Sequence, residues 1–406
     1  MSEQDQKAGL LGELRRGFSH NLKQYAMFIA LLGIWAIFTY LTGGIFISPR
    51  NISNLMVQNS YIAILAVGMV LVIVAGHIDL SVGSVAGFCG AVAAYAQCFW
   101  HWGTVPSLLA ALAVGLLVGI WQGYWIAFKG VPAFIVTLAG WGMFRGMVIL
   151  VTGGQTIAPL HDNFAAIGVG YIPQLFLKGK VGRGEGMVPF HDLTLIIALV
   201  SVVIFIVLEL RNRSRRRGYG FAVLSVPMQA AKIVFLSAMI MVFFYFMIMY
   251  RGIPWAIVVV AVLVLLFNFI STKTVFGRHV YAIGGNKEAA RLSGINIRAL
   301  NLTIFIFMGV LSAISGIVFT GRLNSATASA GNLFELDAIA AAIIGGTSTL
   351  GGEGTIIGAI IGALVMGSLN NGMQLLNIET QYQMIIKGLI LLLAVWFDIS
   401  SRKTTK

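Results

Sequence analysis

The chain is poor in charged residues. Of its 406 residues, 10% are Asp, Glu, Lys or Arg, whereas a soluble domain has roughly 25%. Hydrophobic residues make up 58% of the chain before its 48 glycines are counted. So few polar side chains do not suffice to cover a globular protein of this length in water. The composition therefore excludes a soluble enzyme, a secreted disulfide-linked scaffold, a collagen-like chain and a disordered chain.

Cysteines and catalytic motifs are also lacking. The two cysteines, Cys89 and Cys98, lie in one apolar run at a spacing that matches no metal-binding motif, so we interpret both as small hydrophobic residues. The sequence contains no G-x-x-x-x-G-K-S/T segment for nucleotide phosphates, no G-x-S-x-G and no H-E-x-x-H. We therefore expect no catalytic residue, no metal site and no cofactor held by this chain.

Acidic residues are half as frequent as basic ones, with 14 Asp and Glu against 27 Lys and Arg and a net charge of +13. The basic residues lie in short gaps between apolar runs, not on a continuous face with interleaved aromatic residues. This placement is typical of membrane topology. It predicts the lipid bilayer as a partner and argues against nucleic acid.

What the sequence does contain is apolar runs of membrane-spanning length, which predict an all-α polytopic membrane protein. No cleavage site follows the first run, so it is predicted to be an uncleaved helix. The run at 336–350 is short and contains Gly345-Gly346, so the sequence leaves 10–12 transmembrane helices open. The runs are 24–42, 57–76, 81–100, 105–128, 132–152, 191–210, 231–250, 254–271, 300–320, 336–350, 354–372 and 382–397.

The distribution of basic residues predicts the orientation. With the N-terminus inside, the inside gaps hold 19 Lys and Arg and the outside gaps hold 6. Basic residues favour the cytoplasmic side of a membrane. We therefore expect both termini in the cytoplasm, which requires an even number of crossings.

This topology divides the chain into a cytoplasmic N-terminal segment at 1–23, a transmembrane domain at 24–398 and a cytoplasmic tail at 399–406. Within the transmembrane domain, 153–190 is predicted to be an extracytoplasmic loop and 272–298 a cytoplasmic segment.

The cytoplasmic segment is predicted to contain a short helix. Asn286 is placed to cap its N-terminus, and Gly294 is placed to stop it. We interpret this helix as a docking element; the alternative is a helix that lies on the lipid headgroups.

Charged residues inside apolar runs are costly and therefore informative. Asp79 and Ser81 lie in a polar break before a helix that they could cap, with a substrate contact as the alternative. Arg145 lies in the middle of a run and needs a carboxylate, a carbonyl or water; Glu335 and Asp337 are candidate partners. With Asp79, Ser81, Arg145 and Asp337 we count Asn59, Thr137, Asn370 and Asn371 as candidates for a translocation path.

Other polar residues in the runs have a simpler interpretation. For Asn59, Thr137, Asn370 and Asn371 the alternative is an interhelical hydrogen bond. Lys387 is predicted to extend to the outer membrane interface. No ring of charges and no carbonyl filter appears, which disfavours a channel.

Glycine spacing predicts close helix packing. Gly115-x3-Gly119-x3-Gly123 and Gly358-x3-Gly362 place flat stripes on helix faces. The short sequence at 83–87 is similar to the one at 354–358, and each follows a polar break. Paired breaks of this kind are expected near the central cavity of a transporter.

One motif resembles a known family. Glu288-Ala289-Ala290-x3-Gly294 resembles the cytoplasmic coupling motif of ATP-binding-cassette importer permeases. The wider string from Tyr281 to Asn296 is similar to the monosaccharide branch of these permeases, the ribose, xylose and multiple-sugar type. Similar strings at 78–84, 132–140, 336–340 and 343–354 extend the resemblance from residue 51 to about residue 398. His77 departs from the family's Gly or Glu, which bears on the substrate.

The resemblance implies a permease subunit of the bacterial inner membrane that is not itself an enzyme. It implies two permease copies, an extracytoplasmic sugar-binding protein that hands over a monosaccharide, and a separate ATPase that binds ATP and magnesium. Asn286, Glu288, Ala289, Ala290 and Gly294 would contact the ATPase. The family has about ten spans. A permease for a polyol, an autoinducer sugar or a nucleoside stays open, as does an ion-coupled secondary transporter.

Overall fold

The computed structural model describes residues 22–175, 180–181, 188–221 and 223–403. Most of the predicted N-terminal segment, parts of the predicted loop at 153–190 and the last residues of the tail lie outside this range. Each of the twelve apolar runs contains a helix, although the helix in the run 336–350 ends at Ile344. Helices satisfy every backbone polar group within one segment, which is the requirement that a lipid environment imposes.

The helices that correspond to the apolar runs are α2 Leu22–Leu41, α3 Pro49–Val74, α4 Val82–Cys98, α5 Thr104–Ala127, α6 Ala133–Thr152, α8 Asp192–Gly218, α9 Val226–Ile248, α10 Trp255–Lys273, α13 Ile297–Leu323, α14 Phe334–Ile344, α15 Ile356–Leu375 and α16 Thr380–Lys403. Three short helices, α7 Asp162–Val169, α11 Val275–Gly285 and α12 Lys287–Leu292, lie between them. The two-residue strands β1 Lys180–Val181 and β2 Val188–Pro189 pair antiparallel.

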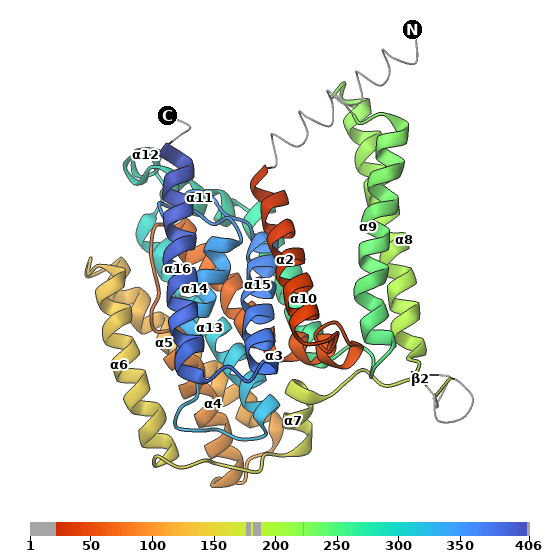
Figure 1. The fold of residues 1–406 in the computed structure, drawn as a ribbon. Helices are drawn as coiled ribbons and strands as arrows, with labels where there is room; N and C mark the ends of the chain where they lie inside the picture. The colour runs from red at the N-terminus through yellow and green to blue at the C-terminus, as the bar shows by residue number, and fades with distance from the viewer. Residues whose placement is uncertain (1–21, 176–179, 182–187, 222, 404–406) are drawn as a thin grey trace, which may run out of the picture.

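The bundle has two ends, and α12 marks one of them. Figure 1 shows that α2 begins and α16 ends at the α12 end, while α7 lies at the opposite end. The first and last helices therefore meet the same face, as an even number of crossings requires.

Two helices are too short to cross a bilayer alone. Among the described residues, nine helices are long and apolar enough to span a membrane. With 17 residues α4 is about 25 Å long and with 11 residues α14 is about 16 Å long, at 1.5 Å per residue, whereas the hydrocarbon core is about 30 Å thick. The segments that precede them, 75–81 and 324–333, are turns and non-helical backbone.

Helices α3 and α13 each pack against several other helices, and glycines let neighbouring helices approach closely. Gly115 and Gly119 of α5 lie against the backbone of Phe305 and Gly309 in α13. Gly362 of α15 lies against Ala341 of α14. The two predicted glycine stripes thus form helix contacts, because a side chain there would collide with backbone atoms.

Helices α8 and α9 form a hairpin beside the bundle. They pack on each other, and α9 contacts α3. Their outward faces are exposed and apolar, as expected of helices that face lipid.

Candidate functional site

Helix α12 is short, capped at both ends and exposed. The Asn286 side chain accepts a hydrogen bond from the Ala289 amide at 2.9 Å, as predicted from the sequence. Gly294 has a φ of +82° and its amide donates to the Arg291 carbonyl at 3.0 Å, so the chain leaves the helix in the left-handed conformation that glycine favours. These contacts give a six-residue helix a fixed start and end.

The outer surface of α12 carries one ion pair and one apolar side chain. Glu288 and Arg291 pair at 2.8 Å, with 70% and 66% of their side chains exposed. Leu292 is 82% exposed. Ala290 faces inward and is buried. An exposed pair of this kind contributes little to stability, so the residues remain available to a partner.

Helix α11 anchors this segment to the bundle. The Tyr281 hydroxyl donates to the Gly354 carbonyl at 2.7 Å, and burial raises the pKa of Tyr281, which keeps the donor protonated. A Cβ at Gly284 would overlap the Val74 carbonyl and lie 2.5 Å from the Gly352 amide. The end of α3 and the loop between α14 and α15 are therefore in direct contact with α11.

Helices α4 and α14, the two that are too short to cross a bilayer alone, meet inside the bundle. α13 starts at the α12 end, and Ala86 and Gly90 of α4 pack on Gly316 and Thr320 in its second half. α14, by contrast, packs on the first turns of α15, through Gly345 against Gly358.

Where α4 and α14 meet, a Cβ on Gly83 would overlap the Gly331 carbonyl and the Glu335 carboxylate. The two N-termini therefore face each other between the two ends of the bundle. The breaks before α4 and α14 therefore lie next to each other. That 83–87 and 354–358 mark corresponding breaks in the two halves of the chain stays a prediction.

Both N-termini carry features typical of a functional break. Leu333, which precedes α14, has a φ of +63°, a strained backbone for a leucine. The positive ends of two helix dipoles meet here. Unwound helices of this kind form the substrate sites of many transporters.

The segment before α4 forms a buried polar network. Asp79 accepts hydrogen bonds from the amide and the hydroxyl of Ser81 at 2.8 and 2.7 Å. Gln122 of α5 donates to the Ser81 hydroxyl at 2.6 Å. Thr137 of α6 donates to the Ile78 carbonyl at 3.3 Å. Asp79 thus holds the turn before α4, and the Ser81 side chain makes no cap hydrogen bond with the helix.

Arg145 contacts a backbone carbonyl, one of the three kinds of partner predicted, and forms no ion pair with Glu335 or Asp337 among the described residues. Its Nη1 donates to the Ala330 carbonyl at 2.8 Å. Trp141 approaches the Glu335 carboxylate, whose Oε2 has no hydrogen-bond partner among the described residues. Arg145 of α6 therefore holds the turn before α14, because a guanidinium can satisfy a carbonyl that no helix uses.

Asp337 pairs with Lys387 instead. The Nζ–Oδ2 distance is 2.9 Å, and the side chains are 18% and 4% exposed for Lys387 and Asp337. The prediction that Lys387 extends to the outer interface is wrong. Its ammonium group instead pairs with a buried carboxylate on the adjacent helix α14, which would otherwise carry an uncompensated charge. The pair joins α16 to α14.

The three candidate asparagines lie between α3, α14 and α15. Asn59 donates to the Ala363 carbonyl at 2.6 Å, Asn371 exchanges hydrogen bonds with Asn51 at 2.8 and 3.1 Å, and Asn370 approaches Asp337. Asn59 and Asn371 therefore connect helices, the alternative that the sequence left open.

The structure adds residues that the sequence analysis missed. Gln122 belongs to the polar network before α4, and Tyr281 and Gly284 attach α11 to the bundle. The sequence could have indicated Gln122, because a glutamine inside an apolar run needs a hydrogen-bond partner. The other two depend on tertiary contacts. Among the described residues, no group of three His, Cys, Asp or Glu side chains could hold a metal ion.

Comparison with known proteins identifies the family. A sequence model of the branched-chain amino acid transport system / permease component family matches residues 51–395. The xylose transport system permease protein XylH of Haemophilus influenzae is 43% identical, over 95% of this chain and 98% of its own. Its counterpart in Escherichia coli K12 is 40% identical, over 95% and 94%.

The ribose import permease protein RbsC of Escherichia coli K12 is 34% identical, over 93% of this chain and 94% of its own. No solved structure matches the chain. Family and relatives cover nearly the whole transmembrane domain, including the 75–81 break, α12 and α14. The chain therefore belongs to this family of permease components, the membrane subunits of ATP-binding-cassette importers among which the xylose and ribose permeases stand.

Proposed function

We propose that this chain is the membrane-spanning subunit of an ATP-driven importer that translocates a monosaccharide. The observation that carries the proposal is the exposed helix α12, which is capped at both ends. Helix α11 anchors it to the end of α3 and to the α14–α15 loop, which lead to α4 and α14. The names of the relatives support xylose or a similar sugar as the solute.

In this proposal α12 inserts into a groove of a separate ATPase, which holds ATP and magnesium. Glu288, Ala289, Ala290 and Gly294 present the contact surface, and the Asn286 cap fixes its direction. Movement of α12 reaches the end of α3 and the α14–α15 loop through α11, because Gly284 leaves no space between them. The ATPase shifts the permease between two states by the difference in its affinity for them.

The solute passes the junction of α4 and α14 in this proposal. Asp79, Ser81 and Thr137 lie on one side of the junction, while Arg145 and Glu335 lie on the other. Carboxylates, hydroxyls and amides are the groups that recognise sugar hydroxyls. Rocking of α4 against α14 would open this point alternately to each end.

Besides the ATPase, two partners complete the proposed assembly in the bacterial inner membrane. A second copy of this chain forms the other half of the pathway, and an extracytoplasmic binding protein delivers the sugar at the α7 end. The α12 end and both termini face the cytoplasm, which places the 19 basic residues inside.

Co-purification tests the coupling role. The tagged chain is extracted from its native membranes with a mild detergent, and the proteins that accompany it are identified by mass spectrometry. We expect an ATPase subunit with the wild type. Glu288→Lys should abolish that association, because it places a positive charge beside Arg291 on the contact surface, while the protein stays in the membrane.

Glu379→Lys is the matched control, since Glu379 is also exposed but precedes α16 at the other end of the bundle. It should keep the ATPase. Recovery of the wild-type chain alone, together with uptake by the purified chain under an ion gradient, would favour a secondary transporter. Uptake of a polyol or nucleoside in place of xylose would change the solute and leave the coupling role intact.

A further inference from the structure

The cytoplasmic half of the α8–α9 hairpin is basic in a way that the coupling and translocation sites do not use. Five arginines, 211, 213, 215, 216 and 217, follow the apolar part of α8. Lys273 ends the neighbouring helix α10. The ion pairs found among the described residues leave all six cations out.

A groove runs along this part of α8. It has a volume of about 780 Å³ and is lined by Phe205, Leu208, Glu209, Arg211, Asn212, Ser214, Arg215 and Lys273. Residues 205, 208, 211, 212 and 215 follow helical spacing and therefore form one stripe. The stripe is apolar at its membrane end and cationic at its α12 end.

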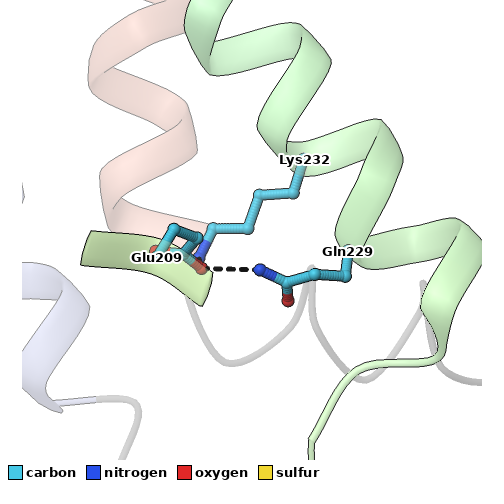
Figure 2. A network of polar contacts seen from close by, with 3 residues as sticks. All are labelled: Glu209, Gln229 and Lys232. Atoms are coloured by element: carbon cyan, nitrogen blue, oxygen red, sulfur yellow. Dashed lines mark hydrogen bonds and ion pairs between the residues drawn. The ribbon is translucent and has the colours of Figure 1, made fainter. Parts of the chain in front are cut away.

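The one carboxylate in the groove is already neutralised. Glu209 accepts hydrogen bonds from Lys232 at 2.5 Å and from Gln229 at 3.0 Å, both on α9. Figure 2 shows the three side chains converging between the two helices. The Lys232 ammonium thus pairs with the Glu209 carboxylate. Arg211, Arg215 and Lys273 consequently face the groove with no compensating charge from Glu209.

We propose that this groove binds one anionic phospholipid, with the phosphate between Arg211, Arg215 and Lys273 and an acyl chain along Phe205 and Leu208. Arginine holds phosphate with two parallel hydrogen bonds. Basic pockets between membrane helices bind anionic headgroups in this way. The lipid fills the groove between α8 and the end of α10. This role is separate from solute transport.

Native mass spectrometry of the full chain tests the site. The detergent-purified protein is incubated with equal amounts of phosphatidylglycerol and phosphatidylcholine of the same acyl chains. We expect the wild type to retain phosphatidylglycerol about tenfold better. Arg211→Gln with Arg215→Gln should remove the preference. Arg216→Gln with Arg217→Gln, which deletes the same charge outside the groove, should keep it.

Three results would overturn the proposal: no preference in the wild type, equal loss in both double variants, or equal occupancy by glycerol phosphate, which has no acyl chain. If the α8 double variant fails to fold, Lys273→Gln tests the same site, because Lys273 lies on α10 and not on α8. It should lower the preference by at least threefold, and an unchanged preference would also contradict the site. Arg211→Lys with Arg215→Lys should restore part of the selectivity.

Discussion

A buried ion pair is the clearest residue-scale feature of the membrane domain. Asp337 and Lys387 compensate each other between α14 and α16. The energy of such a pair is modest relative to an apolar pair, but removal of one partner leaves a buried charge. The sequence could not predict the pairing, because 50 residues separate the two and nothing in either run indicates that α16 packs on α14.

Lys387→Met should therefore destabilise the protein by about 3 kcal/mol. The double variant Lys387→Met with Asp337→Asn should recover most of that loss, since the remaining amide carries no charge. Thermal unfolding of the detergent-purified variants measures both. Equal and additive effects of the two substitutions would show that the side chains do not interact.

Polar residues in the apolar runs were identified from the sequence, but their partners were not. The sequence named Arg145 and its need for a partner, whereas the structure supplies the Ala330 carbonyl. It left two interpretations of Asn59, and the structure shows a hydrogen bond to Ala363. A sequence shows the cost of burying a polar group, but the group that offsets this cost comes from another helix.

At the scale of elements, each of the twelve apolar runs contains a helix, because apolarity and length favour a membrane-spanning helix. The sequence indicated that 336–350 was weak, and α14 ends at Ile344, just before Gly345-Gly346. It did not show that the break before α4 pairs with the one before α14. That pairing depends on close contacts of glycine with backbone atoms, which any glycine-rich helix could make.

The contact between the short helices can be tested at Gly83. A Cβ there would collide with the Gly331 carbonyl and the Glu335 side chain, so Gly83→Ala should destabilise the protein by about 2 kcal/mol. Gly142→Ala is the control, because nothing lies within 4 Å of a Cβ at that position of α6. Unfolding in detergent compares the two, and equal stability would mean that α4 and α14 separate easily.

The link from α12 to the bundle makes a functional prediction. Gly284→Ala should separate α11 from Val74 and Gly352, and should lower sugar-stimulated ATP hydrolysis by the assembled importer about fivefold. Gly285→Ala tests the adjacent position, where a Cβ meets nothing within 4 Å, and should leave the stimulation unchanged. The ATPase should still co-purify with both variants.

Full stimulation in Gly284→Ala would show that the signal takes another route from α12. Loss in both variants would point to the helicity of α11 and not to its contact with α3. The comparison is sharp because the two glycines are neighbours in one helix and differ in what surrounds them.

At the scale of the whole molecule, the distribution of basic residues is consistent with the positions of the first and last helices. The sequence places 19 basic residues in the gaps on one side and 6 on the other. In the structure, the first and last helices meet the same end of the bundle, where α12 also lies (Figure 1). The apolar runs left ten to twelve crossings open, and the positive-inside rule predicts the orientation. The arrangement of the helices around α3 and α13 did not follow from either.

Cysteine accessibility tests the orientation in a background with Cys89→Ala and Cys98→Ser. Leu292→Cys on α12 and Asn163→Cys on α7 replace exposed residues at opposite ends of the bundle. In intact spheroplasts, a membrane-impermeant maleimide should label residue 163 and not residue 292; in inside-out vesicles the result should reverse. Because 19 basic residues would have to cross the membrane in the opposite topology, labelling of residue 292 from outside would refute both the orientation and the proposed contact of α12 with a cytoplasmic ATPase.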